Sequence, residues 1–308
     1  MMTHVYRNAL VFSVIAIGMT ATFGMADDGD SEKYVFRYKF QPGEVLQWEV
    51  TAQVSQLTTF GSNRDNSETL SITTKNWKVL DVDANGTAIL EYRFPDVSMS
   101  SRSSSEGIDR KYDSKTDTKP PVEFLDVAEL VNEPIAHFTI NTKGEILKRT
   151  QKAKVAATMQ FAETAEENRI TIPMPEHAIS VGDAWDYARE ISIPQPNGTV
   201  KKVSVRERYK LEKVQNGVAT FDFKTHIITP LHDDKDTDWA LRTKIRNGKI
   251  QFDMIEGRSI SQQYDVKKTV MGIFHGGHGS ASYQSRFVEK NLRNEPEKVS
   301  MENRNATK

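Results

Sequence analysis

The sequence is punctuated by a turn signal of one kind, the dipeptide Asn-Gly. It occurs four times, at Asn85-Gly86, Asn197-Gly198, Asn216-Gly217 and Asn247-Gly248. A type I′ hairpin turn needs a positive φ angle at both central residues, and Asn followed by Gly meets that need at the lowest cost. We therefore interpret each dipeptide as a candidate turn between two antiparallel strands.

Most of these turns are flanked by segments in which apolar and polar residues alternate. The clearest are YVFRYKF from Tyr34, TAILEYRF from Thr87, ATFDFKTHI from Ala219 and KIQFDM from Lys249. A period of two gives each strand one apolar face, as in antiparallel sheets that cover a core on one side. The sequence therefore predicts a mainly β fold, either an antiparallel meander or a half-barrel.

One or two short helices are expected to cover this sheet. The residues VEFLDVAELVN, which follow Pro120-Pro121, favour a short helix. A second helix is predicted near residues 151–166, where Val155, Met159 and Ala162 have helical spacing, and it ends before the prolines of TIPMP. The Ser-rich segment 98–121 is typical of a long mobile loop or a hairpin tip.

One stretch of the sequence resembles a later one. WKVLDVDANGTAILEY from Trp77 matches YKLEKVQNGVATFDF from Tyr209, and PGEVLQW precedes the first copy as VGDAWDY precedes the second. We interpret the chain as two similar β-rich halves, residues 27–175 with the helix near 151–166 and residues 176–290, followed by a disordered tail at 291–308. Chance similarity is the alternative, because hairpins resemble one another for local reasons.

The segment ISVGDAWDYAREI, residues 179–191, places a Gly-Asp pair before a tryptophan. It could be a reaction site or the beginning of a strand. Gly182 suits a tight turn, Asp183 can accept hydrogen bonds from nearby backbone amides, and Trp185 offers a large area for burial. We favour the beginning of a strand, with Trp185 in the core and not a platform for a ligand.

The first 26 residues have the layout of a secretory signal peptide. One Arg precedes the apolar run ALVFSVIAIGM, and small residues end at Ala26 before DDGD. The run is shorter than the about 20 apolar residues of a membrane span, although an uncleaved anchor is the alternative. No later segment is apolar enough to span a membrane. We expect an exported protein of the periplasm or the extracellular space, without a transmembrane segment after signal removal.

Composition excludes several kinds of chemistry. The chain has no cysteine, which excludes disulfides, a cysteine nucleophile and a lipid anchor on cysteine. A formal net charge of -1 argues against nucleic acid as a partner. The sequence contains no Gly-x-Ser-x-Gly, Ser-x-x-Lys, His-Glu-x-x-His or phosphate-binding glycine loop. No catalytic residue and no cofactor is therefore predicted, which weakens the interpretation as an enzyme without removing it.

Three segments carry residues that can ligate metals. Asp81, Asp83 and Asn85 begin like a calcium loop, but position twelve is Tyr92 where the pattern requires Glu, so a hairpin turn is favoured. The acidic stretch HDDKDTDW, with its charges at residues 232–238, could bind a hard cation or form a solvated loop. The HGGHG segment offers His275 and His278, too few ligands for a zinc site by themselves. Metal binding at the last two segments stays open.

These features resemble a family of exported β-rich bacterial proteins with a VGDxW motif and Asn-Gly hairpins. The resemblance covers roughly residues 34 to 270, through the GE opening strand, the FTINTKGEI hairpin and ISVGDAWDY. The family has no assigned activity, so the resemblance implies no site residue. The predicted architecture is also similar to that of periplasmic lipoprotein carriers, a likeness of fold and not of function.

We therefore carry three hypotheses about function. The first is a non-enzymatic exported protein that binds an apolar small molecule, a lipid or an envelope protein on the concave face of its sheet, where aromatic residues such as Phe36 and Tyr38 gather. The second is a hydrolase that acts on envelope glycans with carboxylates brought together by the fold. The third is a structural envelope protein that binds through loops, with residues 98–121 as the candidate.

Overall fold

The computed structural model describes residues 32–153, 172–195, 198–232, 234–274 and 278–292. The strands are β1 (Val45–Phe60), β2 (Asn63–Val82), β3 (Ala88–Ser103), β4 (Ile108–Asp113), β5 (Ala136–Ile140), β6 (Ile146–Gln151), β7 (Ala184–Pro194), β8 (Val200–Gln215), β9 (Val218–Ile227), β10 (Asn247–Asp253), β11 (Arg258–Phe274) and β12 (His278–Asn291). The predicted signal peptide, the predicted helix beyond residue 153, His275 and the predicted tail beyond residue 292 lie outside the described residues.

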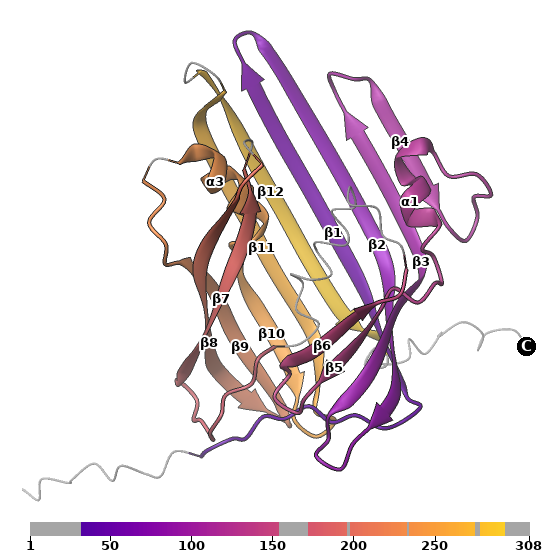
Figure 1. Cartoon of the computed structure of the whole chain (residues 1–308), viewed down its shortest axis with the longest axis vertical. Coiled ribbons are helices and arrows are strands. Elements are labelled where there is room, and N and C mark those ends of the chain that lie inside the picture. Colours follow the sequence, from indigo (N-terminus) through magenta and orange to yellow (C-terminus); the bar gives the residue numbers. More distant parts are fainter. Residues whose placement is uncertain (1–31, 154–171, 196–197, 233, 275–277, 293–308) are drawn as a thin grey trace, which may run out of the picture. The chain divides into compact units, whose positions relative to one another are not determined.

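All described strands belong to one 12-stranded antiparallel sheet (Figure 1). Their order is β6-β5-β3-β2-β1-β12-β11-β10-β9-β8-β7, with β4 paired to β3. Strands β7 to β12 form a meander, whereas in the other half β4 and β5 both pair with β3. The two halves meet where β1 pairs with β12. The predicted antiparallel meander is confirmed, with β6 and β7 as the edges in the described part of the chain. No helix within it is long and apolar enough to cross a membrane.

The Asn-Gly dipeptides differ in backbone conformation. Asn216 and Gly217 have φ angles of 51° and 77°, so they form the predicted turn between β8 and β9. At the turn between β2 and β3, Gly86 has a positive φ angle of 80° and Asn85 does not, so the type I′ prediction is wrong there. The reason is Asp83, whose Oδ1 accepts hydrogen bonds from the amides of Asn85 and Thr87 and stabilises another turn type.

The fourth dipeptide, Asn247-Gly248, is not a turn but begins strand β10. A Cβ atom on Gly248 would overlap the backbone of Gln263 and Tyr264 on the neighbouring strand. The glycine therefore allows two backbones to approach closely, which is the other common reason for glycine inside a strand. Asn197, in the remaining dipeptide, lies outside the described residues.

The segment 98–121 is more ordered than a loop. The end of β3 pairs with β4 from Ser98–Asp113 to Ser103–Ile108, so a hairpin whose tip is residues 104–107 replaces the alternative of a long mobile loop. The predicted short helix after Pro121 is confirmed as η1 (Val122–Phe124) and α1 (Leu125–Ala128). A further helical segment, α3 (Lys235–Ala240) with η2 (Leu241–Thr243), was not predicted.

The residues YVFRYKF do not form a strand of the sheet, in contrast to the prediction. Tyr34 makes an isolated bridge with Ile179. The amide of Tyr38 donates to the carbonyl of Thr142, and the amide of Lys39 donates to the carbonyl of Gly257. Residues 34–39 thus cross the ends of several strands instead of pairing along one. Alternation still places Phe36 and Tyr38 in the core, because an extended segment alternates wherever it lies.

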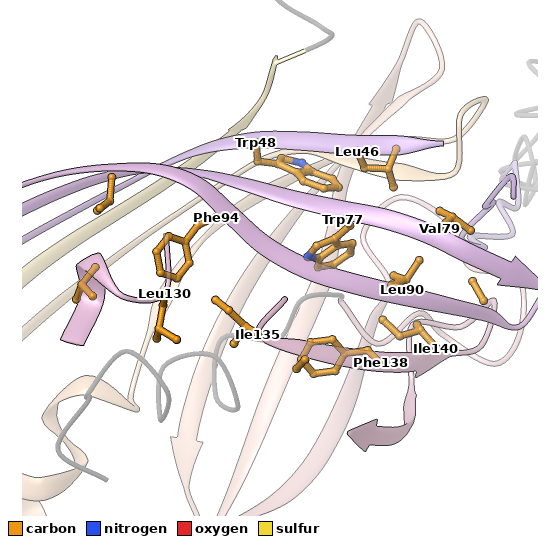
Figure 2. Close-up of a cluster of buried hydrophobic side chains, with 14 of the residues drawn as sticks. Leu46, Trp48, Trp77, Val79, Leu90, Phe94, Leu130, Ile135, Phe138 and Ile140 are labelled. Atoms are coloured by element: carbon orange, nitrogen blue, oxygen red, sulfur yellow. The ribbon is translucent and has the colours of Figure 1, made fainter. Parts of the chain in front are cut away.

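The core lies on one face of the sheet, which we call the inner face, in three clusters. The first includes Leu46, Trp48, Trp77, Val79, Leu90, Phe94, Leu130, Ile135, Phe138 and Ile140 (Figure 2). The second includes Phe36, Tyr38, Met174, Tyr209, Leu211, Phe221, Phe223, Phe252, Tyr264 and Phe287. The third joins η2 to β7 and β8 through Leu241, Ile191, Ile193, Val203 and Val205. Much of the inner face is therefore covered by the protein's own aromatic side chains.

The Gly-Asp pair before β7 begins a strand, as the sequence predicts. The amide of Gly182 donates to the carbonyl of Leu211, the amide of Leu211 donates to the carbonyl of Asp183, and the carboxylate of Asp183 accepts from the amide of Ser180. Trp185 packs against the second cluster, with its ring centroid 5.3 Å from that of Tyr209. Trp185 is thus a core residue, although it is only partly buried.

The Gly-Glu pair before β1 has the same geometry. The amide of Gly43 donates to the carbonyl of Val79, the amide of Val79 donates to the carbonyl of Glu44, and the Glu44 carboxylate accepts from the amide of Gln41. This correspondence supports the interpretation of two similar halves, which stays a prediction.

Candidate functional site

Charged side chains are buried on the inner face beside the aromatic clusters. Lys75 on β2 and Glu289 on β12 are 8% and 3% exposed, and Lys75 Nζ lies 2.7 Å from Glu289 Oε1. The same ammonium lies 4.7 Å and 4.8 Å from the ring centroids of Trp48 and Trp77, close enough for cation–π attraction. Burial lowers the pKa of Lys75, while its ion pair with Glu289 opposes that change. This pair links β2 to β12 across β1.

A second buried charged group lies in the other half of the sheet. Glu207 on β8 is 2% exposed; its Oε1 accepts from Arg189 Nε at 2.9 Å and its Oε2 accepts from the hydroxyl of Tyr209 at 2.8 Å. Arg246 Nη2 lies 3.9 Å from Oε1, and its guanidinium stacks 4.9 Å from the ring of Tyr264. Both groups therefore have charged partners within the protein, and neither offers a free charge to a ligand.

Farther along β1 and β2, and at Ser285 of β12, the inner face carries small or polar side chains that remain at least partly exposed. We call them the open patch: Ala52, Val54, Gln56, Ser67, Thr69, Ser71 and Ser285. Val54 is paired with Thr69 on one side and with Ser285 on the other, so these residues are direct neighbours on one face. Figure 1 shows α1 beside β3 and β4, and α3 beside β11, with β1, β2 and β12 between them. Within the described part of the chain, the side chains of the open patch are therefore at least partly exposed between the two helical segments.

An arginine borders this open patch. Arg242, in η2, stacks over Trp239 and Tyr283, with its Cζ atom 4.6 Å and 5.5 Å from the two ring centroids. Nη1 donates to the carbonyl of Trp239 at 3.0 Å, and among the described residues no acceptor reaches the buried Nε. Burial lowers the pKa of Arg242. Nearby, Lys268 Nζ lies 2.6 Å from Asp238 Oδ1.

A pocket of about 620 Å³ lies where the chain after α1 meets β3 and β5. Its charged lining consists of Glu91, Glu129, Glu133, His137 and Lys152. Glu91 Oε1 accepts from Arg93 Nε at 2.6 Å, and Glu91 Oε2 lies 3.3 Å from His137 Nε2. The hydrogen bond from Arg93 lowers the pKa of Glu91. Glycoside hydrolysis needs a carboxylic acid whose pKa is raised, so Glu91 is unsuited to be the general acid of the hydrolase hypothesis.

Two of the acidic residues at 232–238, Asp234 and Asp238, have partners within the chain, and Asp233 lies outside the described residues. Asp234 caps α3: its carboxylate accepts from the amide and hydroxyl of Thr237 and from Lys201 Nζ at 2.6 Å. These hydrogen bonds, that from Lys201 first, lower the pKa of Asp234 to about 2. Asp238 pairs with Lys268. Within the described residues no group of three His, Asp or Glu side chains could hold a metal ion.

Of the two remaining candidate metal segments, the structure describes the first in full and the second in part. The carboxylates of Asp81 and Asp83 accept hydrogen bonds from backbone amides at the turn between β2 and β3, as the favoured hairpin interpretation requires. His278 is exposed at the beginning of β12, and its proposed companion His275 lies outside the described residues.

Sequence reasoning missed Trp239 and Arg242, because the acidic stretch before them was interpreted as a loop. One signal could have found them: Asp234 is a preferred N-cap residue and is followed by Asp236 and Asp238, and acidic residues in the first turn are typical of a helix beginning. The side chain of Asp234 accepts from the amide of Thr237, as that rule expects.

We expect Asp234→Ala to destabilise the protein by about 1 kcal/mol at neutral pH, because the helix cap and the bond to Lys201 are lost together. Since folding lowers the pKa of Asp234, its stabilisation is present above the unfolded pKa of about 4 and is lost as the pH falls toward 2. Urea denaturation at pH 7, 4 and 2.5 should therefore show a difference from wild type that shrinks with acidity. Asp234→Asn, which keeps a capping oxygen, should lose less; a constant difference at all three pH values would contradict the assignment.

No protein-family model matches this sequence, and no curated protein matches it. Among solved structures, one titled for lipid-protein interactions in lipovitellin is 12% identical, with a TM-score of 0.46, over 82% of this chain and 25% of that chain. The secretin of the Salmonella SPI-1 type III secretion injectisome is 10% identical, with a TM-score of 0.18, over 87% and 63%. A DUF1329 family protein from Desulfovibrio piger is 9% identical, with a TM-score of 0.12, over 79% and 84%.

This chain spans a quarter of lipovitellin and less than two thirds of the secretin. At these identities and TM-scores the comparisons transfer no activity, substrate or partner. The function proposed below is therefore argued from the inner face itself.

Proposed function

We propose that this protein is an exported binding protein that holds an apolar or amphiphilic small molecule on the open patch of its inner face. One observation carries the proposal. The face that is packed with aromatic core residues over much of its area is left at least partly exposed on β1 and β2 and at Ser285 of β12, between two helical segments. Ligand sites are preferentially concave and mostly preformed, and the mouths of β-barrels are among their common locations.

The chemistry of the open patch suits such a ligand. Ala52 and Val54 offer methyl groups, and the surrounding Ser and Thr hydroxyls can donate or accept hydrogen bonds. The two buried charged groups contribute no free charge, so an uncharged chain could lie along the patch without leaving an ion unpaired. Export of the chain after removal of residues 1–26 belongs to the same proposal and is supported by the signal-like sequence alone.

Filling the open patch should weaken ligand binding. We expect the chain from residue 27 to bind the apolar fluorescent probe N-phenyl-1-naphthylamine, and Val54→Phe to weaken that binding by about tenfold or more, because the added ring occupies the site. The measurement is a fluorescence titration at constant protein concentration.

Gln53→Phe is the matched control, because Gln53 is the neighbouring residue on the same strand and is exposed on the opposite face. It should bind the probe as wild type does. If both variants weaken binding equally, or if Val54→Phe binds normally, the open patch is not the site.

A further inference from the structure

Arg242 is a cation whose charge the described part of the chain does not neutralise. A guanidinium has five N–H donors and binds carboxylates and phosphates in a planar fork. Here one hydrogen bond, to the carbonyl of Trp239, is made, and no carboxylate lies within 4.0 Å among the described residues. The aromatic rings of Trp239 and Tyr283 hold the guanidinium in place without balancing its charge. A partly buried cation without a counter-charge is costly, which is typical of a site that is completed by an anion.

The position of Arg242 relates it to the open patch. Tyr283, over which it stacks, is paired with Gln56 on β1 and with Lys268 on β11. Gln56 belongs to the open patch, so the guanidinium lies at the border of that patch. Lys268 adds a second cation there and Asp238 one carboxylate, which leaves this corner with a net charge of about +1. The patch thus has a positive corner and an uncharged interior.

We propose that Arg242 recognises the acidic group, a carboxylate or a phosphate, of an amphiphilic ligand whose apolar part lies on the open patch. This inference rests on the proposed function and names the class of ligand. Trp239 and Tyr283 are the residues that position Arg242, because their rings fix the plane of the guanidinium.

A purely structural role makes a different prediction. If Arg242 only fastens η2 to β12 by stacking on Tyr283, its loss should lower stability and should affect charged and uncharged ligands alike. If it recognises an acidic group, its loss should affect acidic ligands alone. Three ligands with one chain length separate the two roles: dodecanoate, dodecyl phosphate and dodecan-1-ol.

The experiment measures displacement of N-phenyl-1-naphthylamine by each ligand from wild type, Arg242→Gln and Arg242→Lys. We expect Arg242→Gln to weaken dodecanoate and dodecyl phosphate by about tenfold or more, since hydrogen bonds between charged groups are the stronger kind. Dodecan-1-ol should bind as to wild type, and Arg242→Lys should recover part of the loss. Arg286→Gln is the matched control, because Arg286 lies on β12 with a side chain 58% exposed and pairs with Asp265.

Each outcome decides something. Equal weakening of all three ligands by Arg242→Gln, or no weakening, overturns the role of Arg242 while leaving the proposed function intact. Displacement by none of the three from wild type, together with the absence of probe binding, overturns the proposed function as well. Inorganic phosphate and acetate form a further arm: if either binds wild type as tightly as the dodecyl compounds and Arg242→Gln abolishes it, the site takes a free anion and the amphiphile proposal fails. Thermal melting of each variant establishes that it is folded.

Discussion

Replacing Phe36 with alanine should lower the free energy of unfolding by about 3–5 kcal/mol, the usual cost of removing a large aromatic side chain from a packed core. Phe36 is 1% exposed, and its ring centroid lies 5.0 Å from that of Phe221 and 6.4 Å from that of Phe252, both in edge-on contact. Phe36 belongs to the segment that crosses the strand ends, so its loss also loosens the contact of that segment with β9 and β10. The measurement is equilibrium denaturation in urea.

The neighbouring residue supplies the control. Val35 is 56% exposed and points away from the core, so Val35→Ala should change stability by less than about 0.5 kcal/mol. Similar effects of the two substitutions would mean that residues 34–39 are not packed as described.

Replacing Lys75 with methionine should cost about 3–5 kcal/mol, because it leaves the carboxylate of Glu289 buried without its counter-charge. Glu289 would keep the hydrogen bond that its Oε2 accepts from Gln262 Nε2 at 3.2 Å, which is too little to replace an ion pair. The loss should be visible in thermal and in urea denaturation alike.

Two comparisons isolate the origin of this effect. The double variant Lys75→Met/Glu289→Met should recover most of the stability, because an apolar pair of similar volume does not leave a buried charge. Lys202→Met removes one partner of an exposed pair with Glu190, whose side chains are 68% and 57% exposed, and should cost less than about 1 kcal/mol. If the double variant is as unstable as Lys75→Met, the loss comes from packing and not from the unpaired charge.

The fold class was predictable because it depends on local rules. Alternation identified β3, β9 and β10, and the Asn216-Gly217 turn formed as the dihedral preferences require. The exceptions have tertiary causes. Gly248 is needed because the backbone of the neighbouring strand leaves no room for a Cβ atom. Residues 34–39 alternate like a strand although they cross the strand ends. Alternation in the sequence shows which side chains are buried on one side and does not show which strand the backbone pairs with.

The candidate site was not predictable in the same way. Lys75 and Glu289 are far apart in the sequence and meet because β2 and β12 both flank β1, a topology that no local signal encodes. The open patch consists of Ser, Thr, Ala, Val and Gln residues at ordinary strand positions, and their exposure depends on what the helical segments leave uncovered. Arg242 was not predicted, because the acidic stretch before it is compatible with a solvated loop or a cation site as well as with a helix.

The junction between β1 and β12 has a consequence for how this chain is made. The ribosome releases β1 before any other strand of the sheet and β12 after all the others, yet these two pair along most of their length. Until β12 emerges, β1 and β11 are edge strands with unpaired backbone groups. Such edges are templates for unwanted association with other chains. A stop codon that removes β12 would therefore leave two half-sheets that are not joined and are prone to aggregation. It would not yield a shorter working protein.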